Sequence, residues 1–293
     1  MPPLTAEQLA MRNGPDGFVG ASEIAAAIGV SRWSRPIDLW LTKTGRADPE
    51  PENPRAKIGL RAEETMLRWY AEDTGQDVAT FVRGSSVRHP EHPFAGCTPD
   101  FLRIGKDGEL LGLAQMKCVG ARMAIFWPDD ATPADIECQC QYEAEVTGAP
   151  FVDVVAWLGG TDFRIITLER DREFGDMLLR GAESFWKCVR DDMPPPIDGS
   201  ESWRKYLQAR YPVVEKEELD PAHDDVDRWA HESLRSRERI EELEADQEAA
   251  DNRLRALIGE RHGFIGADYV VTWSADKNGK RSLRVKRRKN PND

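Results

Sequence analysis

The sequence predicts an α/β (α+β) fold with a central mixed sheet flanked by helices, followed by a C-terminal helical appendage and a β-hairpin. Three observations predict it. Short apolar runs bounded by Gly, Pro and Asp indicate strands. Longer segments with apolar residues three and four positions apart indicate helices between them. The composition changes after the prolines at 194–196, so we expect a main domain over 1–198 and an appendage over 199–293.

The composition is that of a globular protein with a substantial core. The chain has 293 residues, of which 40% are hydrophobic. No apolar run approaches the ~20 residues that a membrane span requires. The first residues lack the basic and apolar segments of a signal peptide. The five cysteines are an odd number without metal-site spacing, so we interpret them as reduced thiols. We therefore expect a cytoplasmic protein with no membrane partner.

The formal net charge of −12 is unevenly distributed along the chain. Residues 215–260 carry 16 acidic and 7 basic residues, whereas residues 261–293 carry 3 acidic and 9 basic residues. A basic segment suits a nucleic-acid partner, and uncompensated carboxylates elsewhere suit metal binding. The negative total therefore does not exclude DNA as a partner.

Helix signals recur through the main domain. Ser22 precedes an apolar stretch that Gly29 ends, which makes it a candidate N-cap. A Pro-rich loop at 49–54 precedes a strongly amphipathic segment that Gly75 closes. We expect helices over residues 5–13, 22–28, 36–43, 58–74, 133–147 and 173–189.

Strand signals form two hairpins in the main domain. Lys106-Asp107-Gly108 is turn chemistry, because Asp-Gly favours the positive φ that a tight hairpin needs. Gly159-Gly160 separates a second pair of apolar runs. We expect strands over residues 78–87, 101–104, 110–119, 151–158 and 162–168.

The last hundred residues contain a heptad-like helix and a basic hairpin. Between Val226 and Leu257, ten positions at alternating three- and four-residue steps include seven apolar residues. This stripe predicts packing against the main domain or another subunit. Strands over 269–273 and 283–286 are expected around an Asn-Gly turn. Residues 280–289 contain seven bases, which indicates either a solvated tail or a non-specific phosphate contact.

The hairpin over 101–119 is the first candidate for a site. Period two places Gln115 and Lys117 on one face of its second strand, and Asp100 stands where the first strand begins. A lysine between apolar strand neighbours is costly unless an anionic group pairs with it. Gln115-Met116-Lys117 follows Pro99-Asp100 at the spacing of the PD-(D/E)xK nuclease signature, which it resembles, except that Gln115 occupies the usual acidic position.

Each of these residues has an ordinary structural explanation when taken alone. Ser22 can be a helix cap, Glu63 a solvated helix charge, and a Pro-Asp pair followed by a lysine occurs by chance. Their combination is more specific. In chain order the sequence resembles the YqaJ-like viral recombinase family, relatives of phage lambda exonuclease in the PD-(D/E)xK superfamily. The resemblance covers roughly residues 10–196 and is carried by these motifs: Gly20-Ala21-Ser22-Glu23, Ser31-Arg32-Trp33, Leu39-Trp40, Lys43-Thr44-Gly45, Gly59 with Glu63, Pro99-Asp100, Gln115-Met116-Lys117, Gln139 with Gln141, Val146-Thr147-Gly148 and Phe185-Trp186.

The resemblance implies a restriction-endonuclease-like core over 1–198 and a Mg²⁺- or Mn²⁺-dependent double-stranded DNA exonuclease. Such an enzyme would work 5′→3′ and make single-stranded tails for recombination. The resemblance further implies double-stranded DNA ends as the partner, a homo-oligomer (a trimer), a single-strand annealing protein, and a phage or prophage origin in a bacterial host.

By motif position, the resemblance also implies roles for single residues. Glu63 and Asp100 would be metal ligands, completed by Gln115 and the backbone carbonyl of Met116. Lys117 would be the catalytic lysine beside Asp100 and Gln115.

Four further residues would contact DNA by the same resemblance. Gln139 and Gln141 fall in the family's glutamine-bearing helix, beside the scissile phosphate. Arg12 and Ser22 fall where the family holds the 5′-terminal phosphate.

Gln115 leaves three explanations open. An amide oxygen can touch a metal, but without charge it holds Mg²⁺ less well and cannot act as a base. The chain is an engineered inactive variant, a natural enzyme that relies on its other site residues, or a catalytically inactive DNA-end-binding recombination protein. An interaction protein whose functional part is the 215–260 helix is a further alternative.

Overall fold

The computed structural model describes residues 13, 16–47, 54–212 and 224–288. The chain divides into two compact units, 1–213 and 214–293. Arg12 and all but the last residue of the helix expected over 5–13 lie outside the described residues.

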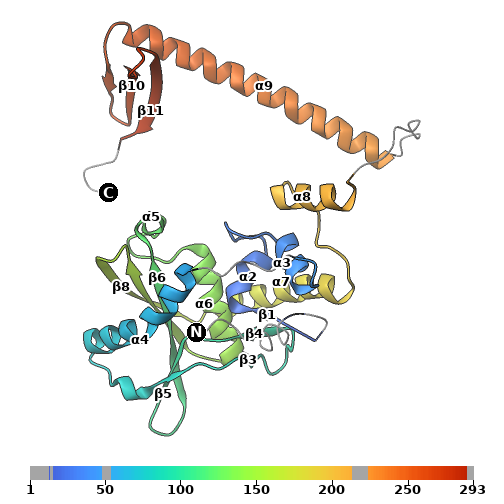
Figure 1. The fold of residues 1–293 in the computed structure, drawn as a ribbon, viewed down its shortest axis with the longest axis vertical. Helices are drawn as coiled ribbons and strands as arrows, with labels where there is room; N and C mark the ends of the chain where they lie inside the picture. Colours follow the sequence, from blue (N-terminus) through green and yellow to red (C-terminus); the bar gives the residue numbers. More distant parts are fainter. Residues whose placement is uncertain (1–12, 14–15, 48–53, 213–223, 289–293) are drawn as a thin grey trace. The chain divides into compact units, whose positions relative to one another are not determined.

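A five-stranded mixed sheet is the centre of the first unit, which confirms the predicted fold class (Figure 1). Its strand order is β2-β5-β6-β7-β8; β6 and β7 run parallel and the other neighbours antiparallel. The strands are β2 Phe81–Arg83, β5 Phe101–Ile104, β6 Leu110–Val119, β7 Phe151–Leu158 and β8 Asp162–Glu169.

The β5–β6 hairpin has the predicted bounds. Gly108 in its turn has a φ of +83°, which a residue with a Cβ adopts only with strain. The register pairs Phe101 with Ala114 and Leu102 with Leu113. This register sets the beginning of β5, and therefore Asp100, beside the middle of β6.

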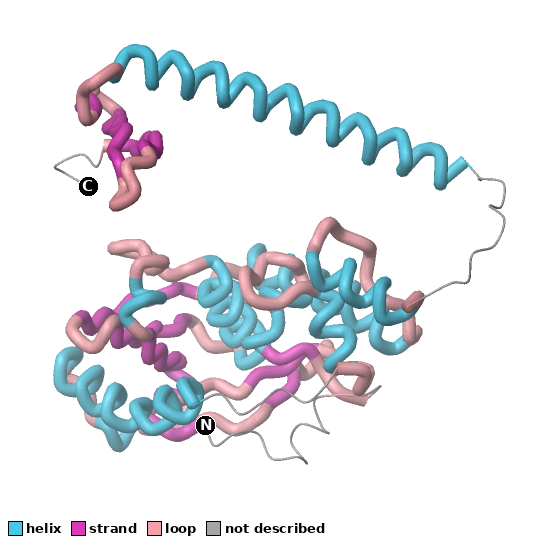
Figure 2. The backbone as a smooth tube through the Cα atoms, turned by 45° about the horizontal axis from the view of Figure 1, so that its top comes forward, coloured by secondary structure: helices cyan, strands magenta, loops and turns pink. Residues whose placement is uncertain are grey.

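Helices cover both faces of this sheet, and Figure 2 shows the strands between them. On one face, α4 (Pro54–Thr74) packs Met66 and Tyr70 against Ala114 and Met116. On the other face, α6 (Ala134–Thr147) packs Cys140 and Ala144 against Leu113. Because strand side chains alternate, the odd-numbered residues of β6 face α6 and the even-numbered residues face α4.

A second apolar core lies beside the main sheet. It is built on a small sheet of order β1-β4-β3 and includes Ile24, Trp40, Tyr142, Leu178 and Trp186. Its elements are β1 Val19–Gly20, α2 Ala21–Ala27, α3 Pro36–Lys43, β3 Val87–Arg88, β4 Ala95–Cys97, α7 Arg172–Arg190 and α8 Glu201–Arg210. The α6 helix joins both cores, because Tyr142 faces this one while Cys140 faces the sheet.

The single strand expected over 78–87 is wrong. Val78–Thr80 forms a 3-10 turn, η1, in which the side chain of Asp77 accepts a hydrogen bond from the amide of Ala79. The rest is divided between β2 in the main sheet and β3 in the small sheet. Gly84 and Ser85, between them, are turn-forming residues, and the apolar pattern alone did not show the break.

A buried lysine ties the start of α2 to α3. Lys43 is fully buried; its Nζ lies 2.7 Å from a Glu23 oxygen and donates to the Phe18 carbonyl at 2.8 Å. Glu23 also accepts from the amide of Gly20 at 2.7 Å, so it caps α2 from inside the helix. Lys43 and Glu23 therefore hold α2 and α3 together, and we assign them a structural role.

The boundary between the units lies after residue 213 and not after 198. The α8 helix belongs to the first unit because Trp203 is buried in the second core and its ring meets that of Tyr206 edge-on. Ser200 begins the helix by accepting a hydrogen bond from the amide of Trp203.

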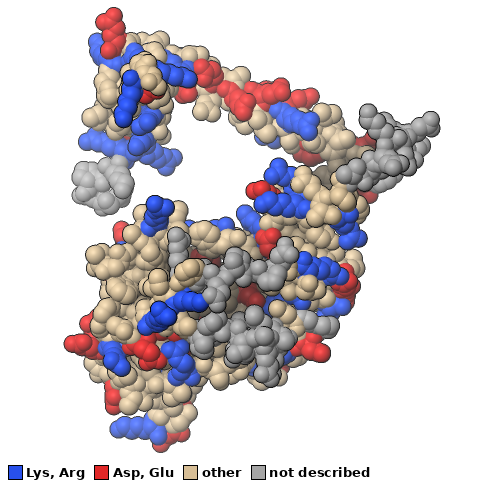
Figure 3. Space-filling view, in the orientation of Figure 1, with Lys and Arg blue, Asp and Glu red and all other residues tan. Residues whose placement is uncertain are grey.

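The described part of the second unit contains one long helix and a three-stranded antiparallel sheet. The α9 helix spans Asp224–Ile258, and the sheet contains β9 Gly263–Ile265, β10 Tyr269–Ala275 and β11 Arg281–Arg287. Arg281 joins them, because its guanidinium lies 3.7 Å from the Trp273 ring centroid and donates to the carbonyl of Gly259. Figure 3 shows acidic side chains along α9 and basic ones over the hairpin.

Among the described residues, no helix is both long and apolar enough to cross a membrane.

We expect Trp203→Ala to lower the free energy of unfolding of the first unit by roughly 3–5 kcal/mol, the usual cost of truncating a buried tryptophan. Denaturant unfolding of the full chain, followed by far-UV circular dichroism, measures this. Tyr211→Ala is the matched control, since Tyr211 is exposed just beyond α8. Equal stability of both variants would contradict the assignment of α8 to the first unit.

Candidate active site

Asp100 is buried where β5 begins and is bonded to the neighbouring strand. Its Oδ2 accepts a hydrogen bond from the backbone amide of Met116 at 2.8 Å, and only 7% of the residue is exposed. Burial raises the pKa of the Asp100 carboxyl to about 6, against the opposing charge of Lys117. The predicted neighbourhood of Asp100 and Lys117 is thereby present in the structure.

Lys117 connects the sheet to α6 through a chain of hydrogen bonds. Its Nζ donates to Oε1 of Gln139 at 2.8 Å, and Nε2 of Gln139 donates to Oε1 of Glu143 at 2.9 Å. Gln139 therefore has one defined amide orientation, with its oxygen toward the lysine. This chain fixes the position of the Lys117 ammonium group at the end of β6.

Glu143 is a buried acid that the sequence analysis did not single out. It is 1% exposed, and its Oε2 has no hydrogen-bond partner in the described structure. Burial raises the pKa of the Glu143 carboxyl to about 8, although the Gln139 bond and Lys117 act in the opposite direction. Its sequence signal was its position four residues after Gln139, on the same helix face.

Gln115 is also buried with an unsatisfied oxygen. It is 4% exposed, faces α6 with Lys117, and its Oε1 has no donor among the described residues. An unpaired buried acceptor costs roughly 1–3 kcal/mol. A cation or a water molecule beside this oxygen would remove that cost.

Glu63 reaches the site from α4 and is held by an arginine. Nη1 of Arg83 lies 2.7 Å from a Glu63 oxygen, and Nη2 lies 2.9 Å from an oxygen of Glu64. The charge of Glu63 contributes to the raised pKa of Asp100, so the two acids lie close enough to interact. Arg83, which the sequence did not indicate, partly neutralises the negative charge of Glu63 and Glu64.

The other predicted residues are placed differently. The side chain of Met116 packs toward α4, so only its backbone is available to the site. Gln141 bonds the backbone at the beginning of α7: its Nε2 donates to the Glu169 carbonyl and its Oε1 accepts from the Asp171 amide. Ser22 is exposed in the first turn of α2. The structure therefore brings together Glu63, Asp100, Gln115, Lys117 and Gln139, without Gln141.

The donor atoms at this site suit a hard divalent cation, although with few charges. No group of three or more His, Cys, Asp or Glu side chains in the described ranges is arranged to hold a metal ion. The reason is visible in the residues: one position is the amide Gln115, and Glu63 is paired with Arg83. The unsatisfied oxygen of Gln115 beside buried Asp100 nonetheless fits the oxygen ligands that Mg²⁺ and Mn²⁺ prefer.

Comparison with known proteins agrees with this architecture. Residues 8–150 match the family described as the YqaJ-like viral recombinase domain. Over these residues the chain is similar to that domain. The resemblance predicted from the motifs is thereby confirmed. The uncharacterized protein YqaJ of Bacillus subtilis (strain 168) is 26% identical over 261 residues, which cover 87% of this chain and 79% of that protein.

Solved structures resemble the recombinase domain in fold. An alkaline exonuclease from Laribacter hongkongensis superposes with a TM-score of 0.52 at 20% identity, covering 71% of this chain and 98% of that one. The same exonuclease in complex with dAMP gives a TM-score of 0.50 at 19% identity, covering 68% and 95%. At identities this low, the structural similarity shows a shared fold and no more.

We expect Glu143→Gln to stabilise the protein increasingly as the pH rises from about 4.5 to about 8. In this range the unfolded carboxyl is ionised while the buried one keeps its proton, so wild-type stability falls with pH. The variant lacks this loss, so the difference grows by at most about 1.4 kcal/mol per pH unit.

Urea unfolding at several pH values measures the difference. Glu173→Gln, at an exposed position of α7, is the control and should track the wild type throughout. A Glu143→Gln difference that is constant with pH would contradict the buried, proton-holding state of Glu143.

Proposed function

We propose that this chain is a Mg²⁺- or Mn²⁺-dependent double-stranded DNA exonuclease that works 5′→3′ and makes single-stranded tails for recombination. The observation that carries the proposal is that Asp100, at the start of β5, lies beside Gln115 and Lys117 of β6 within a segment that matches the YqaJ-like recombinase domain. The fold shared with an alkaline exonuclease supports it, as does the dAMP complex of that enzyme, because dAMP is a mononucleotide.

The residues have separable tasks in this proposal. Asp100, Gln115 and the Met116 carbonyl would hold the divalent ion, with Glu63 released from Arg83 as a further ligand. The bound ion supplies Lewis-acid stabilisation and an activated water. Lys117, fixed by Gln139, places its positive charge beside the phosphate. Because burial raises the pKa of Asp100 to about 6, we expect the site to bind cations well only above that pH.

Gln115 favours a second candidate, a DNA-end-binding recombination protein without catalysis. One buried carboxylate is replaced by an amide, so the cation has less charge to bind than in an acidic triad. Under this alternative the chain binds duplex ends, and Mg²⁺ yields no products. A homo-oligomer and a single-strand annealing partner belong to both proposals, and the exposed α9 stripe with Trp229, Ile240 and Leu243 supports an oligomer.

The DNA-binding part of the proposal extends to the basic hairpin. Arg284, Lys286, Arg287 and Arg288 are exposed on or beside β11. Charges of this kind contact phosphates without reading sequence, and such binding weakens as salt rises.

Incubation of 5′-phosphorylated linear duplex, 5′-hydroxyl linear duplex and closed circular DNA with Mg²⁺ tests the proposed function. We expect the 5′-phosphorylated linear duplex to be degraded and the circle to survive. Degradation of the circle at the same rate would exclude an exonuclease. Binding of linear ends without any product would select the inactive alternative.

We expect Gln115→Glu to raise the cleavage rate by about 10²–10³-fold, because an ionised ligand restores roughly 3–4 kcal/mol of transition-state stabilisation. Single-turnover degradation of labelled duplex measures this. The variant should also be less stable than the wild type in EDTA and regain stability with Mg²⁺, since its added carboxylate is buried near Asp100.

Gln115→Leu is the matched control, similar in size and without the oxygen. It should not raise the rate. Equal rates and equal metal affinity for Gln115→Glu and the wild type would show that residue 115 does not limit catalysis.

A further inference from the structure

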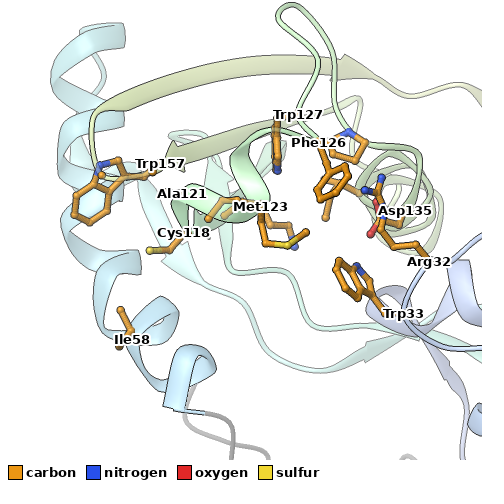
Figure 4. A pocket seen from close by; sticks show the side chains of 17 residues that line it. Arg32, Trp33, Ile58, Cys118, Ala121, Met123, Phe126, Trp127, Asp135 and Trp157 are labelled. Carbon is orange, nitrogen blue, oxygen red and sulfur yellow. The ribbon is translucent and has the colours of Figure 1, made fainter. Parts of the chain in front are cut away.

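An apolar pocket of about 570 Å³ opens beside Lys117, at the end of β6. Figure 4 shows Ile58 and Trp157 on one side and Trp33 and Phe126 on the other, with Cys118 and Met123 between them. Volumes of a few hundred Å³ are typical of pockets that bind small organic groups. Lys117 itself lines the pocket, so the cavity borders the candidate active site at this residue.

Two aromatic side chains in this pocket are exposed to solvent. Trp33 is 66% exposed and Phe126 is 49% exposed, whereas the facing Trp157 ring packs edge-on against Trp69. The segment that carries Trp33 is ordered, because the hydroxyl of buried Ser31 accepts hydrogen bonds from the amides of Trp33 and Ser34. The fold thus fixes the backbone of an aromatic residue whose ring faces water at the pocket.

Two basic residues and one acidic residue line the pocket. The guanidinium of Arg32 lies 5.0 Å from the centroid of the Phe126 ring. Lys117 provides a second cation, and Asp135, which lies beside Arg32 in Figure 4, is the acidic residue of the lining. A ligand with a flat apolar part and an adjoining anion complements this lining. A nucleotide has both parts, and its phosphate would lie on the side of Lys117.

We propose that this pocket takes up an unpaired nucleobase of the DNA end whose phosphate reaches Lys117, with Trp33 and Phe126 as stacking surfaces. The inference rests on the proposed function and adds a subsite to it. Aromatic rings bind every base through its π-face, so the pocket tolerates all sequences, as an enzyme that degrades long DNA requires. Taking a terminal base out of its stack is least costly at a strand end, where pairing is weakest.

Affinity of the full chain for dye-labelled blunt duplexes, measured by fluorescence anisotropy in Ca²⁺, tests the pocket. The duplexes carry an abasic residue at one of the last three positions of either strand, or none. Trp33→Ala should bind the intact end roughly 5- to 100-fold more weakly, the usual loss of one base–aromatic stack. At one abasic position the same substitution should have no effect, because the base is already missing.

Two controls separate stacking from misfolding. Trp33→Tyr keeps a ring and should retain most of the affinity, and Tyr211→Ala removes an exposed aromatic ring just beyond α8 and should leave the dependence on the terminal base unchanged. If Trp33→Ala weakens binding to intact and abasic ends equally, or weakens binding to neither, the pocket proposal is wrong. Binding of duplex ends by the wild type would still support the proposed function in that case. If the wild type neither binds nor degrades duplex ends, the proposed function fails and the pocket proposal fails with it.

Discussion

The hydrogen bond from Lys117 to Gln139 is the interaction on which the candidate site depends. It joins β6, which carries Gln115 and Lys117, to α6, which packs on the same face of the sheet. The lysine would otherwise be a half-buried cation between apolar neighbours, and the glutamine would lack a donor for its oxygen. The apolar contacts of Cys140 and Ala144 with the sheet bring the two groups within reach, and Glu143 fixes the amide from the other side.

The candidate site has few free negative charges. Asp100 is buried and its pKa is raised, and Glu63 forms an ion pair with Arg83. The third position, Gln115 on β6, is an uncharged amide. The Gln115 oxygen is buried without a partner among the described residues, and a bound cation or water molecule would offset the cost of burying it. These features are the basis of the proposal that residue 115 limits catalysis in this chain.

Local signals predicted much of this structure. The β5–β6 hairpin and the face shared by Gln115 and Lys117 followed from a period of two and one Asp-Gly turn. These local patterns did not predict two features. One is the division of 78–87 between two sheets, and the other is the packing of α8 onto the first unit through Trp203. Both depend on contacts distant in sequence, which periodicity does not encode. For the same reason the sequence did not predict the Arg83–Glu63 ion pair. It also did not predict that Gln141 bonds the backbone of Glu169 and Asp171, just before α7.

Mn²⁺ binding to the full chain, followed by electron paramagnetic resonance at pH 8, tests whether Asp100 and its neighbours form a divalent-cation site. We expect one bound Mn²⁺ per chain in the wild type and at least a tenfold weaker affinity in Asp100→Asn. Asp107→Asn, in the exposed hairpin turn a few residues away, should bind as the wild type does. Equal Mn²⁺ affinity in Asp100→Asn and the wild type would show that Asp100 does not hold the cation.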